Sequence, residues 1–324
     1  AEDFTSRTAM LEHRFLAGHL PLAADLEKRL AQDLFSKDAK EFIDAKLSER
    51  EARHLKQGER YMVEPNVKEG KGGLRDLQSL FWIAKYLHGV DDAAELVDLG
   101  VFAQDEFDRF DRAERFLMAV RNQLHLISGR AVDQLTFDMQ VEVAGQLGYT
   151  DRGGRRAVEH FMQDYFRHAT TVGELTRIFL TKIEATHATR TSRITNLFKT
   201  KPNVPAGYEI KQSRLCHSDD ESFLADRLNL LRVFQYGLST GLMIHPDTMR
   251  LVTANLDKFN AEMRKDPEAN ALFLSLLLDH GNPERALRRM NELGVLGAFI
   301  PEFQPVVAMM QFNMYHQYTV DEHT

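Results

Sequence analysis

The sequence predicts a mostly α-helical protein with helical bundle-like domains and at most a small β-hairpin near residues 208–217. Apolar residues recur at helical spacing along most of the chain. Glycines follow the last apolar positions of two predicted helices, at Gly89 and Gly129, where a helix commonly ends. One stretch, about residues 186–221, loses this periodicity and collects Ser, Thr, Asn and Pro, which is typical of a linker.

The helices follow one another along the chain. Leu22, Leu26, Leu30 and Leu34 fall four residues apart after Pro21 and form a single apolar stripe. Such stripes imply that helices pack on one another around a shared core. We expect further helices over residues 38–58, 76–88, 107–127, 158–183 and 228–238, after Pro246, and from 283 to 293.

A short hairpin is predicted inside the interrupted stretch. Residues 208–210 and 214–216 combine aromatic and branched apolar side chains, and the three residues 211–213 separate them. This segment is the only candidate for β structure that the sequence offers.

Composition limits the classes of function. The 324 residues suggest roughly two domains. A net charge of −7, from 41 basic and 48 acidic residues, argues against a nucleic-acid partner. The single cysteine, Cys216, excludes an internal disulfide and any multi-cysteine zinc site, and favours a cytoplasmic location. Apolar runs are far shorter than a membrane span, so we expect no membrane partner. The chain begins at Ala1 rather than Met, so we expect a piece of a longer protein.

The densest chemical signal lies in residues 64–76. Its glycines permit a tight turn, and Lys68, Lys71 and Arg75 supply positive charge just before a helix. Free N–H groups at that helix start would suit a phosphate or another anion. The alternative is a tight turn into a helix with solvated lysines. The segment matches neither a Walker loop nor a dinucleotide-binding fingerprint.

Two histidine pairings are weaker signals. Arg121 and His125 lie four apart, which allows a ligand cleft but equally a helix surface pair. His316 and His323 are seven apart, and two histidines alone do not complete a metal site.

Residues 64–68 and 72–76 together with residues 296–324 resemble one family: the bifunctional uridylyltransferase/uridylyl-removing enzymes of the nitrogen regulator PII. Segments 11–14, 121–125, 164–167 and 230–234 agree with it in the same order, so the resemblance spans nearly the whole chain. In that family a nucleotidyltransferase domain moves UMP from UTP to a PII tyrosine, an HD domain removes it, and ACT domains sense glutamine.

The resemblance implies a division into five segments and no complete active site. The sequence has no Gly-Gly-x-Gly-Arg-Gly-Glu loop and stops before the His-Asp pair of an HD site. We therefore expect the chain alone to be inactive. The expected segments are the end of the transferase domain with charged helices (1–60), a uridylyltransferase-associated helical domain (61–185), a linker (186–225), a helical connector (226–300) and a truncated HD start (301–324).

The same resemblance suggests site residues. Lys68, Gly72, Gly73, Arg75 and Asp76 match the family string and are expected to border the nucleotide, with Lys68 and Arg75 offsetting triphosphate charge. The resemblance also implies Mg²⁺ or another divalent metal in the intact enzyme.

His323 matches the first metal-ligating histidine of an HD domain. Because its partner ligands lie outside this sequence, we expect only weak metal binding there.

Two alternatives remain at this stage. One is the helical domain of another nucleotidyltransferase such as a glutamine synthetase adenylyltransferase, which shares shorter versions of the first motif. The HD-like tail argues against it. The other is a helical interaction module that binds a regulator without chemistry.

Overall fold

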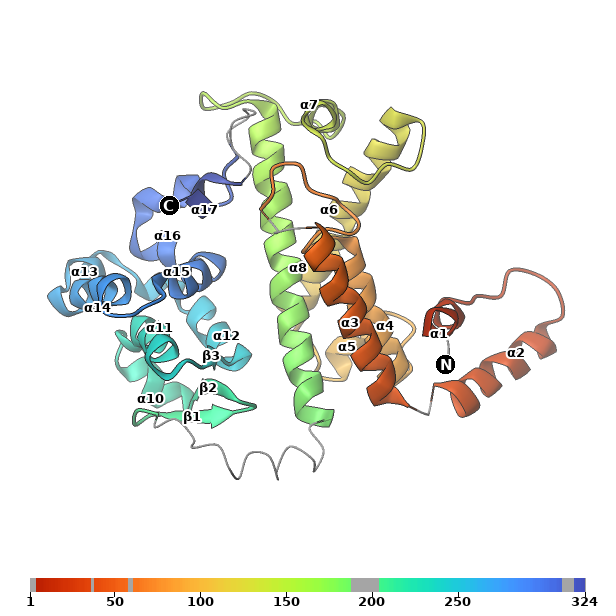
Figure 1. Cartoon of the computed structure of the whole chain (residues 1–324), viewed down its shortest axis with the longest axis horizontal. Coiled ribbons are helices and arrows are strands. Elements are labelled where there is room, and N and C mark those ends of the chain that lie inside the picture. The colour runs from red at the N-terminus through yellow and green to blue at the C-terminus, as the bar shows by residue number, and fades with distance from the viewer. Residues whose placement is uncertain (1–3, 36–37, 58–60, 188–203, 311–317, 324) are drawn as a thin grey trace. The chain divides into compact units, whose positions relative to one another are not determined.

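A computed structural model describes residues 4–35, 38–57, 61–187, 204–310 and 318–323 (Figure 1). The chain forms two compact units. Unit 1 comprises residues 1–179 with 310–319, and unit 2 comprises residues 180–309 with 320–324. The five segments expected from the sequence are a finer division than these two units, and they stay a prediction.

Unit 1 is built from helices alone, apart from isolated bridges, in the residues described. Two of its helices end as the sequence predicted: Gly89 and Gly129 both adopt the left-handed conformation directly after a helix. Its elements are α1 (Phe4–Leu11), α2 (Leu20–Arg29), the π-helix η1 (Leu30–Leu34), α3 (Ala39–Gln57), α4 (Leu74–His88), α5 (Glu95–Asp98), α6 (Gln104–Ser128), α7 (Phe137–Gln146) and α8 (Ala157–His187), whose last residues belong to unit 2.

The core of unit 1 is formed where α3, α4, α6 and α8 turn their apolar faces inward. Phe42 of α3 stacks on Tyr86 of α4, with ring centroids 4.1 Å apart. Leu117 of α6 and Phe161 and Phe166 of α8 are fully buried. Burial of each such side chain contributes about 1.5–3 kcal/mol, so these faces add substantially to the stability of unit 1.

Unit 2 is mostly helical, with one small sheet. Its core gathers Leu230, Leu231 and Phe234 of α11 with apolar side chains from the following helices. Its elements are β1 (Tyr208–Lys211), β2 (Arg214–His217), α10 (Asp220–Ala225), α11 (Asn229–Thr240), β3 (Met243–Ile244), α12 (Pro246–Ala254), η3 (Leu256–Lys258), α13 (Ala261–Lys265), α14 (Pro267–Leu278), α15 (Pro283–Glu292), α16 (Val295–Phe299), η4 (Pro301–Val306) and α17 (Val320–His323).

The predicted hairpin is confirmed, and the sheet has one strand more. β1 and β2 pair antiparallel, with Lys211 opposite Arg214. β3 adds a parallel edge of two residues, pairing Leu215 with Ile244. So short a strand carries no periodicity, which is why the sequence did not reveal it. The mostly α fold class is confirmed.

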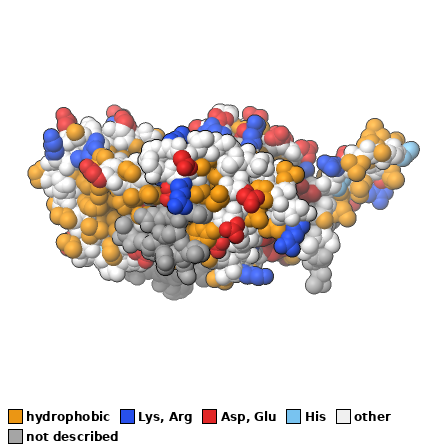
Figure 2. Space-filling model, turned by 90° about the horizontal axis from the view of Figure 1, so that it is seen from above, with side chains coloured by type: hydrophobic (Ala, Val, Ile, Leu, Met, Phe, Trp, Pro, Cys, Tyr) orange, Lys and Arg blue, Asp and Glu red, His pale blue; other side chains and the backbone are white. Residues whose placement is uncertain are grey.

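Of the apolar stripe predicted after Pro21, Leu30 at the start of η1 is buried as expected, whereas the part in α2 is not. Leu22 is 68% and Leu26 is 45% exposed, and α2 has no buried residue. Figure 2 shows hydrophobic side chains gathered at the end of the view that holds α2. Periodicity identifies the apolar face of a helix but carries no information on what covers that face.

Among the described residues, no helix combines the length and the apolar character that crossing a membrane requires.

Candidate functional site

The motif at residues 64–76 forms a closed turn, which we call the glycine loop (residues 64–73), followed by α4. The carbonyl of Asn66 accepts the Gly70 N–H at 2.9 Å, and the Asn66 side chain accepts the N–H groups of Lys68 and Glu69. The loop then returns to the start of α4, because the Leu74 N–H donates to the Val67 carbonyl at 3.0 Å.

The first N–H groups of α4 are therefore bonded within the motif. Arg75 N–H donates to the Lys68 carbonyl at 2.9 Å, and Asp76 N–H donates to the Gly73 carbonyl at 3.0 Å. The sequence led us to expect these groups to face a ligand. Any anion held here would instead depend on side chains.

Two glycines let the loop approach other backbone closely. Gly72 has φ +82°, and a Cβ atom there would lie 2.3 Å from the carbonyl oxygen of Ala169 in α8. A Cβ atom on Gly73 would lie 2.7 Å from the Val67 carbonyl oxygen. Because such distances are far inside van der Waals contact, these positions require glycine. Gly72 thus lets the loop pack closely on α8, and Gly73 lets the loop close on itself.

Asp76 is the buried anchor of the motif. Its side chain is 0% exposed and accepts hydrogen bonds from Arg53 at 2.5 Å, His54 at 2.9 Å and the Gly72 N–H at 2.9 Å. Arg50 lies 3.4 Å away. Burial raises the pKa of Asp76, but the His54 hydrogen bond, the Arg50 charge and the Gly72 N–H outweigh it and lower the pKa to about 2.

Lys68 and Arg75 meet at the partly exposed carboxylate of Glu69. Lys68 Nζ lies 3.8 Å and Arg75 Nη2 lies 3.4 Å from the same Glu69 oxygen. Arg53 approaches the other oxygen at 3.8 Å. The Arg75 guanidinium also lies over the Trp82 ring, 5.3 Å from its centroid. The structure therefore brings together two of the three cations that the sequence selected, Lys68 and Arg75, with Glu69 as a counterion that it did not.

We define the basic cluster as Arg50, Arg53, Lys68 and Arg75. Ion pairs join these four cations to the carboxylates of Glu69 and Asp76, and the charge of Lys68 also acts on Asp133. Positive charge is thus gathered at one place in a protein whose net charge is −7. Cations gathered in this way attract anions.

Arg121 and His125 form a neighbouring ion-pair group. Both contact the carboxylate of Asp133, at 2.7 Å and 3.2 Å. Asp133 is placed beside the glycine loop because its carbonyl accepts the Val67 N–H at 2.8 Å. Burial raises the pKa of Asp133, but hydrogen bonds from Arg121 and His125 and the charge of Lys68 lower it overall. Asp133 lies twelve residues beyond Arg121, a spacing that no helical pattern could have revealed.

His323 ends α17, but its side chain lies outside the described residues, and so does His316. The neighbouring Asp321 is described: it accepts hydrogen bonds from the Ala308 N–H at 2.9 Å and from Asn291 at 2.7 Å. The predicted metal role of His323 therefore stays a prediction.

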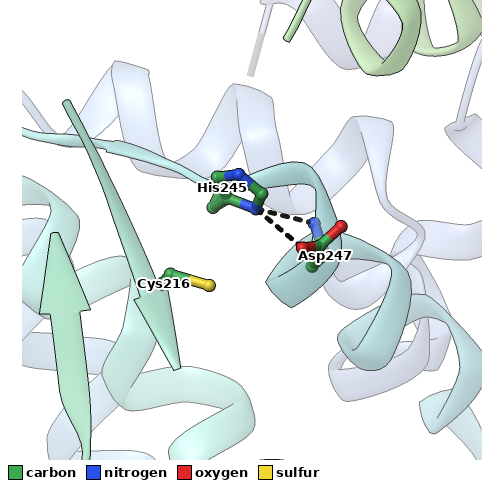
Figure 3. Close-up of side chains that lie close together, drawn as sticks. All are labelled: Cys216, His245 and Asp247. Carbon is green, nitrogen blue, oxygen red and sulfur yellow. Dashed lines mark hydrogen bonds and ion pairs between the residues drawn. The ribbon is translucent and has the colours of Figure 1, made fainter. Parts of the chain in front are cut away.

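Within the described residues, one group of side chains has the donor types of a metal site (Figure 3). Cys216 of β2 lies close to His245 and Asp247, at the start of α12, with their donor atoms all within 4.8 Å of one another. Burial raises the pKa of the Cys216 thiol and lowers that of His245. Burial also raises the pKa of Asp247, but the hydrogen bond from Lys211 reverses this and the net pKa is lowered.

Comparison with known proteins identifies two family regions. Residues 41–180 match the family described as GlnD PII-uridylyltransferase, and residues 208–299 match the one described as Uridylyltransferase GlnD third domain. The first region contains the glycine loop and the basic cluster. The second contains the three-stranded sheet and most of the unit 2 core.

Two relatives match the chain over its whole length. The bifunctional uridylyltransferase/uridylyl-removing enzyme of Ruegeria pomeroyi is 65% identical over 323 residues, which cover 100% of this chain and 36% of that protein. The enzyme of the same name from Cereibacter sphaeroides is 62% identical over 324 residues, covering 100% of this chain and 35% of that protein. No solved structure matches. The resemblance stated from the motifs is confirmed: the chain belongs to the bifunctional uridylyltransferase/uridylyl-removing enzyme family and spans about a third of the length of these relatives.

Proposed function

We propose that this chain is the central helical part of an enzyme that transfers UMP from UTP to a tyrosine of PII and removes it again by hydrolysis. The observation that supports this most is identity of 62–65% to bifunctional enzymes of that name along the entire chain. The chain alone is inactive in this proposal, because the sequence contains no nucleotidyltransferase loop and no His-Asp pair of an HD site in the expected context.

The five segments keep the roles that the resemblance implied. Residues 1–60 finish the transferase domain, and 61–185 form its helical partner. Residues 186–225 link this part to a connector at 226–300, and 301–324 begin the HD domain. Glutamine acts as effector through a domain outside these residues. The enzyme works in the cytoplasm, without a membrane or nucleic-acid partner.

In this proposal Lys68 and Arg75 face the triphosphate of UTP. Two facts favour them: both side chains are partly exposed, and both approach the single carboxylate of Glu69. An incoming triphosphate, with more negative charge than Glu69, would compete for these cations. Gly72, Gly73 and Asp76 act as positioning residues, because they fix the loop backbone that carries Lys68 and Arg75.

The divalent metal of the intact enzyme does not fit the motif itself. Mg²⁺ supplies charge neutralisation at a phosphorus under attack and needs free carboxylate oxygens. Asp76 and Glu69 are both in contact with arginines, and Asp76 is fully buried. We therefore assign no Mg²⁺ ligand to the motif and propose that the transferase metal is held by residues outside it.

The test uses the full-length gene product and measures UTP affinity and the rate of UMP transfer to purified PII. We expect Lys68→Ala and Arg75→Ala each to weaken UTP binding by roughly tenfold, the loss of about one charge-assisted contact. Arg115→Ala is the matched control, because Arg115 is 79% exposed and pairs only locally with Asp111. Arg75→Lys keeps the positive charge but removes the guanidinium that lies over Trp82, so it shows which of the two UTP binding requires.

Three results would contradict the proposal. Unchanged UTP affinity in both alanine variants would remove the nucleotide role of Lys68 and Arg75. Transfer of AMP to glutamine synthetase, with none of UMP to PII, would make the protein an adenylyltransferase. Binding of PII without transfer or removal of UMP would make it an interaction module.

A further inference from the structure

The group formed by Cys216, His245 and Asp247 is held in place by backbone pairing. His245 directly follows β3, and its N–H donates to the carbonyl of Leu215 in β2 at 2.8 Å. This bond holds the start of α12 beside Cys216, the next residue of the same strand. Figure 3 shows the Cys216 sulfur pointing toward the gap between His245 and Asp247. The three donors therefore converge because of the sheet topology, although 28 residues lie between Cys216 and His245 in the sequence.

We propose that Cys216, His245 and Asp247 bind one divalent transition-metal ion, with Zn²⁺ as the best match. Thiolate, imidazole and carboxylate are the three side-chain donors that Zn²⁺ takes, at about 2.0–2.3 Å. The sulfur donor disfavours Mg²⁺ and Ca²⁺, which prefer oxygen. A thiolate and a carboxylate together balance the charge of the ion.

The site has room for a fourth ligand. A polar pocket of about 540 Å³ lies against it, lined by Cys216 and Asp247 with Lys211, His217, Asp220 and Arg250 among others. Water from this pocket would complete a tetrahedral shell, as in zinc sites with three protein ligands. The donor atoms lie up to 4.8 Å apart, and a tetrahedral site needs about 3.5 Å. Closing this gap requires the Asp247 carboxylate, which is 38% exposed, to move away from Lys211 and Arg250.

Lys211 places its positive charge against the Asp247 carboxylate, where a metal ion would bind. Its Nζ donates to Asp247 Oδ2 at 2.8 Å, and its side chain is 45% exposed, so it can leave toward solvent. Arg250 lies 3.4 Å from the other Asp247 oxygen. Both cations compete with the metal and reduce its affinity, which makes removal of Lys211 an informative variant.

His245 also has a structural role that the test must separate from metal binding. Its Nδ1 accepts the Asp247 N–H at 3.1 Å and so caps the start of α12, and a metal bound at Nδ1 would take this lone pair and replace the hydrogen bond. Serine caps helices well but is a poor zinc ligand, so His245→Ser keeps the cap and loses the imidazole. Within the described residues, the Cys216 sulfur accepts one hydrogen bond, a weak one from Thr248 Oγ1 at 3.7 Å. Cys216→Ser is therefore a small structural change.

The experiment titrates the metal-free chain with Co²⁺, whose thiolate bond gives an ultraviolet charge-transfer band, and then displaces it with Zn²⁺. We expect one equivalent to bind with this band. Cys216→Ser should abolish the band, and both Cys216→Ser and His245→Ser should weaken binding by roughly 100-fold or more, since even supporting residues of metal sites cost 10–100-fold. Lys211→Met should strengthen binding by about tenfold.

Two controls decide between sites. His323→Ala should leave the band and the stoichiometry unchanged, since the inferred site does not include it. Loss of binding in that variant would place the metal at the chain's C-terminal histidine and overturn the inference. So would the absence of a thiolate band, or tight binding that persists in Cys216→Ser. Circular dichroism of each variant checks that the helices are intact.

Discussion

The carboxylate of Asp76 lies 2.5 Å from the guanidinium of Arg53, so a buried ion pair joins the first turn of α4 to the last third of α3. The same carboxylate accepts the Gly72 N–H and therefore also holds the glycine loop. A single acidic side chain thus fixes two helices and the turn that carries Lys68 and Arg75. We therefore expect Asp76 to act on function by positioning Lys68 and Arg75.

We expect Asp76→Asn to destabilise unit 1 by roughly 2–4 kcal/mol. Asparagine keeps the shape and can still accept the Gly72 N–H, but it leaves Arg50 and Arg53 without their buried counter-charge. Trp82 is the only tryptophan and lies in α4, so its fluorescence during urea unfolding reports on unit 1. Asp108→Asn is the control: Asp108 is exposed and bonds only to Gln104, and its loss should cost under about 0.5 kcal/mol. Equal stability of the two variants would refute the anchoring role.

Acid should remove the contribution of Asp76 within a defined pH window. The folded-state pKa of about 2 lies below the ordinary aspartate value of 3.8, so the ionised form stabilises the fold above about pH 4. This contribution, about 2 kcal/mol, is lost as the pH falls from about 4 to about 2. Urea titrations of the wild type and Asp76→Asn at several pH values should therefore converge toward pH 2. A difference that stays constant across this range would contradict the assignment.

The sequence predicted local structure better than it predicted partners. Gly89 and Gly129 end their helices as expected, since a left-handed residue after an apolar stripe is a local signal. The sequence could not reveal the partners of the motif, because Asp133 and Arg53 come close to it only through tertiary packing. For the same reason, the pattern identified Lys68 and Arg75 but could not show that Glu69 joins them. The stripe of α2 was recognised, but its exposure was not.

Gly72→Ala should be far more damaging than an alanine at another left-handed glycine of the same unit. At Gly72 the new methyl group would lie 2.3 Å from the Ala169 carbonyl oxygen, so either the loop or α8 must move. Gly89 has a similar φ of +67°, but no neighbouring atom lies within 4 Å of where its Cβ would be. Gly89→Ala should therefore cost only the conformational strain of about 1 kcal/mol. We expect roughly 3 kcal/mol or more for Gly72→Ala, measured by Trp82 fluorescence. Equal costs would show that the close approach is not required.

Ser213→Gly should stabilise the β1–β2 hairpin. Gln212 and Ser213 form its two-residue turn with φ values of 52° and 57°, a conformation that side chains other than Gly and Asn adopt at a cost of about 1–2 kcal/mol. Gln212 also bonds to His245, so Ser213, which is exposed, is the position to change.

Glycine also makes the unfolded chain more flexible, which offsets part of this relief. We therefore expect Ser213→Gly to stabilise the hairpin by about 0.5–1 kcal/mol. The measurement is amide hydrogen exchange across β1 and β2, which should slow by roughly two- to fivefold. Ser239→Gly provides the opposite case, because Ser239 lies in α11, where glycine weakens a helix. Faster exchange of the hairpin amides in Ser213→Gly would mean that the serine stabilises this turn, and the strain argument would fail.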